Sequence, residues 1–134
     1  MNVTATGNTA VAIANTVFRT SSSYSISGTI TLGAASPTKV CNILIDQDNN
    51  LSNGFTDGVQ ISCGSSTSVP FTLSLVPTGS FFLATHADNN DTVVNTGDYF
   101  GYHNGTGMAA PGAASVTVTA ADVASVNLTP QLVP

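Results

Sequence analysis

The chain has 134 residues, of which 7% are charged; it carries two Lys or Arg residues, seven Asp, no Glu and a formal net charge of −5. Two basic residues cannot make the positive surface that binds phosphates, so nucleic acid is excluded as a partner. The length suits one domain with a real core, and a positive mean hydropathy with so little charge excludes an intrinsically disordered chain.

The composition favours strands over helices. Thr, Ser, Val and Ala dominate, whereas the helix formers Lys, Arg and Glu are nearly absent. Gly, Pro and Asn recur about every ten residues, as expected for short strands joined by turns. We therefore predict an all-β protein, an antiparallel β-sandwich of about seven to nine strands.

Residues 1–22 are predicted to form an N-terminal arm or edge strand, and residues 23–134 the sandwich domain. Within the arm, the apolar segment AVAIANTVF at 10–18 is suited to pair with the sheet of a neighbouring copy. The polar start MNVTATGNT does not resemble a signal peptide, and no run approaches the about 18 apolar residues of a membrane helix. With two cysteines and little charge, we expect the mature form of a secreted protein that does not insert into a membrane.

The first predicted strand of the sandwich covers residues 24–32. Apolar side chains alternate there with Ser and Thr, which is the period of two expected for a strand with one buried face. Gly28 interrupts this apolar face.

Residues 39–46 and 58–63 are predicted to form an antiparallel hairpin. The register that gives one apolar face and one mostly polar face pairs Cys41 with Cys63, Ile43 with Ile61 and Ile45 with Val59. This register predicts a Cys41–Cys63 disulfide, which would contribute about 3 kcal/mol to stability on a chain-entropy estimate. Two free buried thiols are the alternative.

Further strands are predicted along the rest of the chain. Val69, Phe71, Leu73 and Leu75 alternate along one strand, and PTGS at 77–80 supplies turn residues before a strand at 81–87. A short strand follows at 97–103. Residues 114–120 and 124–130 are predicted to pair with each other and close the fold.

Six of the seven Asp residues fall into two clusters, and the first lies in DQDNNLSNGFTD, residues 46–57. Oxygen-bearing residues occupy positions 1, 3, 5, 7 and 12 of this stretch, the spacing of an EF-hand-type calcium loop: Asp46, Asp48, Asn50, Ser52 and Asp57. Leu51 stands where that motif has Gly, and Asp57 where it has Glu. We predict a Ca²⁺ site here, because Mg²⁺ usually keeps more water ligands.

The second cluster lies in HADNNDTVVNTGD, residues 86–98, where a folded-back loop would bring four oxygen donors together: Asp88, Asn90, Asp91 and Asp98. We predict a second Ca²⁺ site in this loop. His86 and His103, with Asp98, are candidates for a small metal or acid–base site, although satisfied surface histidines are the simpler interpretation. For both clusters the alternative is ordinary turn chemistry without a metal, since Asp, Asn and Gly are common turn residues.

The order YSISGTITL, VCNILID, VPFTLSLVPTGSFFLATHADNNDTVVNTGDYFGYH and SVTVTAADVASVNLTP resembles the prealbumin-like (transthyretin-like) β-sandwiches, which include carboxypeptidase regulatory-like domains. The resemblance covers about residues 23–130. It rests on Pro77, Gly79 and Phe81 in a P-x-G-x-[FY] turn, and on an Asp-rich loop that ends in Gly97, Asp98 and Tyr99. It implies a seven-stranded sandwich of a bacterial or archaeal surface protein, with a structural, adhesive or assembly role and no catalysis.

The residue content of the chain bears on three functional classes. The chain is predicted not to be an enzyme, because it has two His and no Glu for acid–base chemistry. A calcium-dependent adhesin or carbohydrate-binding module is the alternative function, with Tyr99 and Tyr102 as candidate contacts to a glycan or cell surface. The favoured prediction is a secreted, calcium-stabilised structural protein that assembles with its own copies into an extracellular fibre or surface layer. Two Ca²⁺ ions would raise the formal charge from −5 to −1 and so reduce repulsion between copies.

Overall fold

The structure is a computed structural model that describes residues 23–34, 39–88 and 93–134. In these ranges it contains nine strands and one short 3₁₀ helix, η1 (Leu51–Asn53). The strands are β1 (Tyr24–Thr31), β2 (Lys39–Asp46), β3 (Asp57–Gly64), β4 (Ser68–Val76), β5 (Gly79–Asp88), β6 (Tyr99–Tyr102), β7 (Val116–Val118), β8 (Val123–Leu128) and β9 (Gln131–Leu132). The predicted arm at 1–22 lies outside the described residues.

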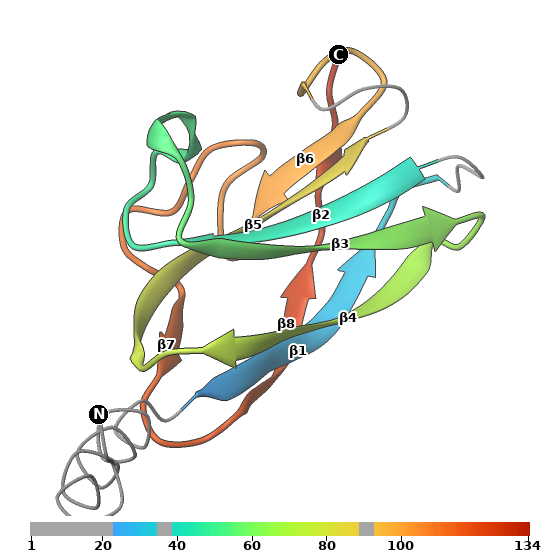
Figure 1. The fold of residues 1–134 in the computed structure, drawn as a ribbon. Helices are drawn as coiled ribbons and strands as arrows, with labels where there is room; N and C mark the ends of the chain where they lie inside the picture. Colours follow the sequence, from blue (N-terminus) through green and yellow to red (C-terminus); the bar gives the residue numbers. More distant parts are fainter. Residues whose placement is uncertain (1–22, 35–38, 89–92) are drawn as a thin grey trace, which may run out of the picture.

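The strands form two packed sheets, so the predicted all-β sandwich is confirmed (Figure 1). The smaller sheet has the order β4-β1-β8, and the larger has the order β3-β2-β5-β6-β9, with β7 paired to the start of β5. One apolar cluster fills the space between them, with contributions such as Ile26 and Phe71 from the smaller sheet and Ile43 and Leu83 from the larger. All pairs are antiparallel except β1 with β8, which run parallel.

The disulfide between Cys41 and Cys63 is present, with a Cα–Cα distance of 5.6 Å. The predicted register of its hairpin is wrong by two residues, because Cys41 pairs with Ile61 and Ile43 with Val59. A shift of two keeps every side chain on its predicted face, and it lets the Gln60 amide donate to Asn42 Oδ1 at 2.9 Å. An irregularity between Lys39 and Val40 marks the disulfide end of the ladder.

A bulge in β4 changes which side chains point inward. Leu75 was expected on the buried face, yet its side chain is 76% exposed and its φ is 63°. The ladder with β1 shifts at this point, and Val76 takes the inward position with no exposed surface. The extra residue of a bulge reverses the alternation that follows it.

The predicted closing pair of strands is also wrong. Segment 114–120 contains β7, which pairs with β5, and segment 124–130 contains β8, which pairs with β1. The two segments therefore join different sheets. Likewise, residues 77–78 carry the chain from β4 in one sheet to β5 in the other, and the two strands are not partners.

The central strand of the larger sheet is covered on both faces. Residues 81–88 of β5 are all buried. The inward face meets the smaller sheet, while the outer face, with Phe82, Ala84, His86 and Asp88, also lies beneath other parts of the chain. This covered outer face holds the candidate functional residues.

Candidate metal centre

Strands β5 and β6 bring three ionisable side chains together at one end of the larger sheet. His86 pairs with Phe100 and Ala87 with Tyr99, so the same register places Asp98 opposite Asp88. One ligand atom from each of His86, Asp88 and Asp98 lies within 4.8 Å of the others. The three residues are 5%, 8% and 0% exposed, so the cluster is buried.

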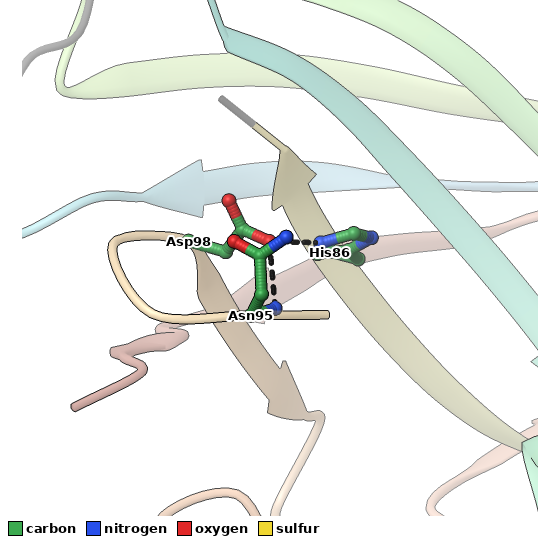
Figure 2. Close-up of polar contacts among 3 residues, drawn as sticks. All are labelled: His86, Asn95 and Asp98. Atoms are coloured by element: carbon green, nitrogen blue, oxygen red, sulfur yellow. Dashed lines mark hydrogen bonds and ion pairs between the residues drawn. The ribbon is translucent and has the colours of Figure 1, made fainter. Parts of the chain in front are cut away.

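Hydrogen bonds orient the Asp98 carboxylate toward the imidazole (Figure 2). His86 Nε2 and Asp98 Oδ2 are 3.0 Å apart, and the Asn95 backbone N–H donates to the same oxygen at 3.0 Å. The Asp98 N–H in turn donates to the Asn95 carbonyl at 3.1 Å, which closes a tight turn. Gly97 supplies the positive φ of 96° that this turn requires.

The C-terminal residues hold the turn in place. The Val133 N–H donates to the Asp98 carbonyl at 2.8 Å, and the Gly97 N–H donates to the Val133 carbonyl at 3.0 Å. The Thr96 hydroxyl also donates to the Pro134 carbonyl at 2.8 Å. β9 pairs with β6 through Tyr99 and Leu132, so these contacts extend the β6–β9 ladder by one residue. They fix the backbone of Asp98.

This donor set is chemically suited to a divalent cation. Two buried carboxylates repel each other, and bringing them together costs free energy unless positive charge lies between them. A metal ion bound by one imidazole nitrogen and two carboxylate oxygens would supply that charge. The nitrogen favours ions of the Zn²⁺ type over Ca²⁺, which takes oxygen ligands. Calcium was the prediction for this loop; its other predicted ligands, Asn90 and Asp91, lie outside the described residues.

The first acidic loop is organised by its own hydrogen bonds. Asp48 accepts from the Asn50 N–H at 2.8 Å and from the Asn53 amide at 3.1 Å. These bonds, the Asn53 one foremost, lower the pKa of the exposed Asp48 carboxyl. Asn50 Oδ1 accepts from both the backbone N–H and the hydroxyl of Ser52. Asn50 therefore caps the N-terminus of η1 through its bonds from Ser52, in the manner of an ordinary turn residue.

The structure does not gather all five predicted donors of this loop. Asp57 pairs with Ile45, whose side chain is in the core, while Asp46 is the next residue along β2 and points to the outer face. Asp46 and Asp57 therefore lie on opposite faces of the ribbon. Asp57 Oδ1 accepts from the Gly58 N–H at 2.7 Å instead.

The two candidate tyrosines lie on different faces of β6. Tyr99 is 7% exposed and belongs to the core, whereas Tyr102 is half-buried on the outer face. Phe100 shares that face, and its ring meets the Tyr102 ring edge to face with centroids 5.5 Å apart. Only Tyr102 of the two is placed where a surface ligand would reach it.

An open cleft of about 480 Å³ crosses the outer face between the two acidic loops. Its lining residues are Leu44, Leu51, Ser52, Phe55, His86, Val93, Val94 and Phe100. His86 thus belongs both to the buried cluster and to the wall of the cleft. Phe55, Val93 and Val94 remain 54%, 64% and 45% exposed around it, so this face presents apolar surface to solvent.

His103 is placed apart from the cluster. Its Nδ1 is 3.0 Å from the Ser115 hydroxyl, and burial lowers its pKa. The pairing of His86 with Asp88 was not predicted, although the His-x-Asp spacing of a strand places both on one face. That spacing, together with the register between β5 and β6, is the signal that could have found the cluster.

Comparisons with protein-family models, with curated proteins and with solved structures found no match for this chain. The described residues include no helix that is long and apolar enough to cross a membrane.

Proposed function

We propose that this chain is a secreted, non-catalytic β-sandwich that divalent metal stabilises and that assembles with its own copies into an extracellular fibre or surface layer. The buried cluster of His86, Asp88 and Asp98 carries the proposal. The chain has only seven acidic residues, yet two of them are buried with an imidazole, and the three potential ligand atoms lie within 4.8 Å of one another. A bound cation readily accounts for this arrangement.

Other features support the extracellular and assembly parts of the proposal. A disulfide joins β2 to β3, and such bonds persist mainly in oxidising compartments. β3, β4 and β8 lie at the edges of their sheets, where a second chain can add a strand. Exposed apolar side chains such as Leu75 and Leu132 offer further contact area. The prealbumin-like resemblance is compatible with this role and remains a prediction.

Metal dependence is tested by unfolding the metal-stripped protein in urea with added Zn²⁺, the type of ion that the imidazole nitrogen of the cluster favours. At a metal concentration about 100 times the Kd, the free energy of unfolding should rise by about 2.7 kcal/mol. The Asp98→Asn protein should lose this gain, whereas Asp122→Asn should keep it. Asp122 makes the same charge change away from the cluster, where its carboxylate accepts from the Ser25 N–H. Equal gains in wild type and Asp98→Asn would contradict a metal at this cluster.

Assembly is tested by light scattering on the same proteins. We expect particle size to grow with added Zn²⁺ for wild type and Asp122→Asn, and to stay constant for Asp98→Asn. A wild-type protein that remains monomeric at every metal concentration would contradict the assembly role, even if metal still stabilised the fold.

The cleft favours a second candidate, a metal-dependent carbohydrate-binding or adhesive module. Its wall combines His86 from the metal cluster with the ring of Phe100, and aromatic rings commonly stack on sugars. Glycan-array binding that is lost in Phe100→Ala and in chelator would favour this candidate. If the metal-loaded protein binds no glycan, the carbohydrate-binding candidate is contradicted and assembly is the remaining proposal.

A further inference from the structure

The last residue of β2 carries a buried carboxylate oxygen without a hydrogen-bond partner. Asp46 is 8% exposed. Its Oδ1 accepts from the Gln47 N–H at 2.8 Å and from the Thr56 hydroxyl at 3.2 Å. Its Oδ2 is buried and has no partner. A buried, charged oxygen left unpaired costs free energy, so a positive group is expected beside it.

Asp48 follows Asp46 by two residues, and strand pairing places Tyr102 on the same outer face. Tyr102 pairs with Ala84, and Asp46 pairs with Phe82, the next outward-facing residue of β5. Burial, followed by the charges of Asp46 and Asp48, raises the pKa of the Tyr102 hydroxyl. Three oxygen-bearing groups, from the end of β2, the loop after it and β6, therefore lie at the same end of the outer face.

The described residues place no Lys or Arg close to these carboxylates along the backbone. Lys39 is the only Lys or Arg among the described residues, and it begins β2 at the opposite end of the strand from Asp46. Seven residues of extended strand separate the two α-carbons by about 23 Å. Because the Asp48 carboxylate is exposed, an ion can reach it from solvent.

We propose that Asp46 Oδ2 and the Asp48 carboxylate bind a hard divalent cation of the Ca²⁺ type, with the Tyr102 hydroxyl beside the ion. The site is separate from the cluster of His86, Asp88 and Asp98. Its donors are oxygens alone, which is the set that Ca²⁺ prefers, and water molecules complete its coordination. It does not use Asp57, on the other face, or Asn50, whose side-chain oxygen caps η1.

Terbium luminescence tests the site, because Tb³⁺ replaces Ca²⁺ and emits when a nearby tyrosine is excited. Wild type should show tyrosine-sensitised emission that Ca²⁺ displaces. Asp46→Asn and Asp48→Asn should weaken Ca²⁺ affinity by about tenfold or more, as loss of a charged ligand does. Tyr102→Phe should lose most of the emission yet retain Ca²⁺ affinity by calorimetry.

Asp57→Asn is the matched control, because it removes the same charge from the same loop but on the opposite face. Its Ca²⁺ affinity should equal that of the wild type. Emission and Ca²⁺ affinity that are the same in wild type and Asp46→Asn, or equal losses in Asp46→Asn and Asp57→Asn, would overturn the proposal. Zn²⁺ calorimetry on Asp46→Asn reports separately on the cluster at His86, so failure of one site is distinguishable from failure of the other.

Discussion

Burial changes the acid–base behaviour of His103. The imidazole is partly buried against the Ser115 hydroxyl, and the backbone N–H of His103 donates to the Leu83 carbonyl at 2.8 Å. Desolvation disfavours the charged imidazolium and so lowers the pKa of His103 below its usual value. In the unfolded chain the imidazole regains its ordinary pKa of about 6.5.

This difference predicts a pH-dependent stability. Below about pH 6.5 the unfolded chain binds a proton at His103 more readily than the folded chain does. The contribution of His103 is therefore fully present above that pH and is lost as the pH falls through the lower pKa of the folded state. His103→Asn should show a smaller loss of unfolding free energy between about pH 7.5 and 5.5 than the wild type, measured by urea denaturation.

Ser115→Ala serves as the control for this prediction. The substitution removes the hydroxyl partner but leaves the imidazole buried, so the pH dependence of the wild type should remain. The same pH dependence in His103→Asn and wild type would show that burial of His103 does not affect stability.

Gly28 permits the parallel contact between β1 and β8. A Cβ atom at this position would lie 1.7 Å from the Val126 carbonyl oxygen and 2.5 Å from the Val126 carbonyl carbon. Both are backbone atoms of the neighbouring strand, so they cannot move aside as a flexible side chain can. The glycine that interrupts the apolar face of the first strand is thus explained by close backbone approach.

Gly28→Ala is therefore expected to destabilise the protein by about 2 kcal/mol or more, because β8 must shift away from β1. The free energy of unfolding in urea measures the effect. Gly112→Ala is the matched control, since its Cβ would meet no atom within 4 Å, and it should change stability by about 0.5 kcal/mol or less. Stability of Gly28→Ala equal to that of wild type would contradict the observed pairing of β1 with β8.

The two proposed metal sites lie at opposite ends of the same strand pair. Asp46 pairs with Phe82 and Val40 with Asp88, so six residues of β5 separate the two ends of the ladder. This corresponds to about 20 Å of extended strand. The cleft lies between the sites and includes His86, but neither Asp46 nor Asp48 lines it. The sites share no ligand and should act independently.

Independence predicts additive effects of substitution. In saturating Zn²⁺ and Ca²⁺, the losses of unfolding free energy in Asp46→Asn and Asp98→Asn should add in the double variant to within about 0.5 kcal/mol. Urea unfolding of the four proteins measures the coupling. A double variant that loses much less or much more than the sum would show that the two ends of the sheet are coupled through the cleft.

Local sequence patterns predicted much of the secondary structure and one covalent link. Alternation of apolar and polar residues located β1 to β4 closely, because a half-buried strand leaves a period of two in the chain itself. The disulfide was predictable because Cys41 and Cys63 lie on the same face of neighbouring strands. The acidic loops were also visible, since acidic residues stand out in a chain with so little charge.

Only the tertiary structure decided which residues face each other. Alternation identifies the face of a side chain but is unchanged by a register shift of two, which is why the pairing of Ile43 with Val59 was missed. The bulge at Leu75 and the separate partners of β7 and β8 likewise depend on contacts between distant segments. For the same reason, the sequence determined that carboxylates would cluster in two loops. The fold decided that Asp57 turns away from Asp46 and that His86 joins Asp88 and Asp98, because ligand geometry is set by strand pairing across the sheet.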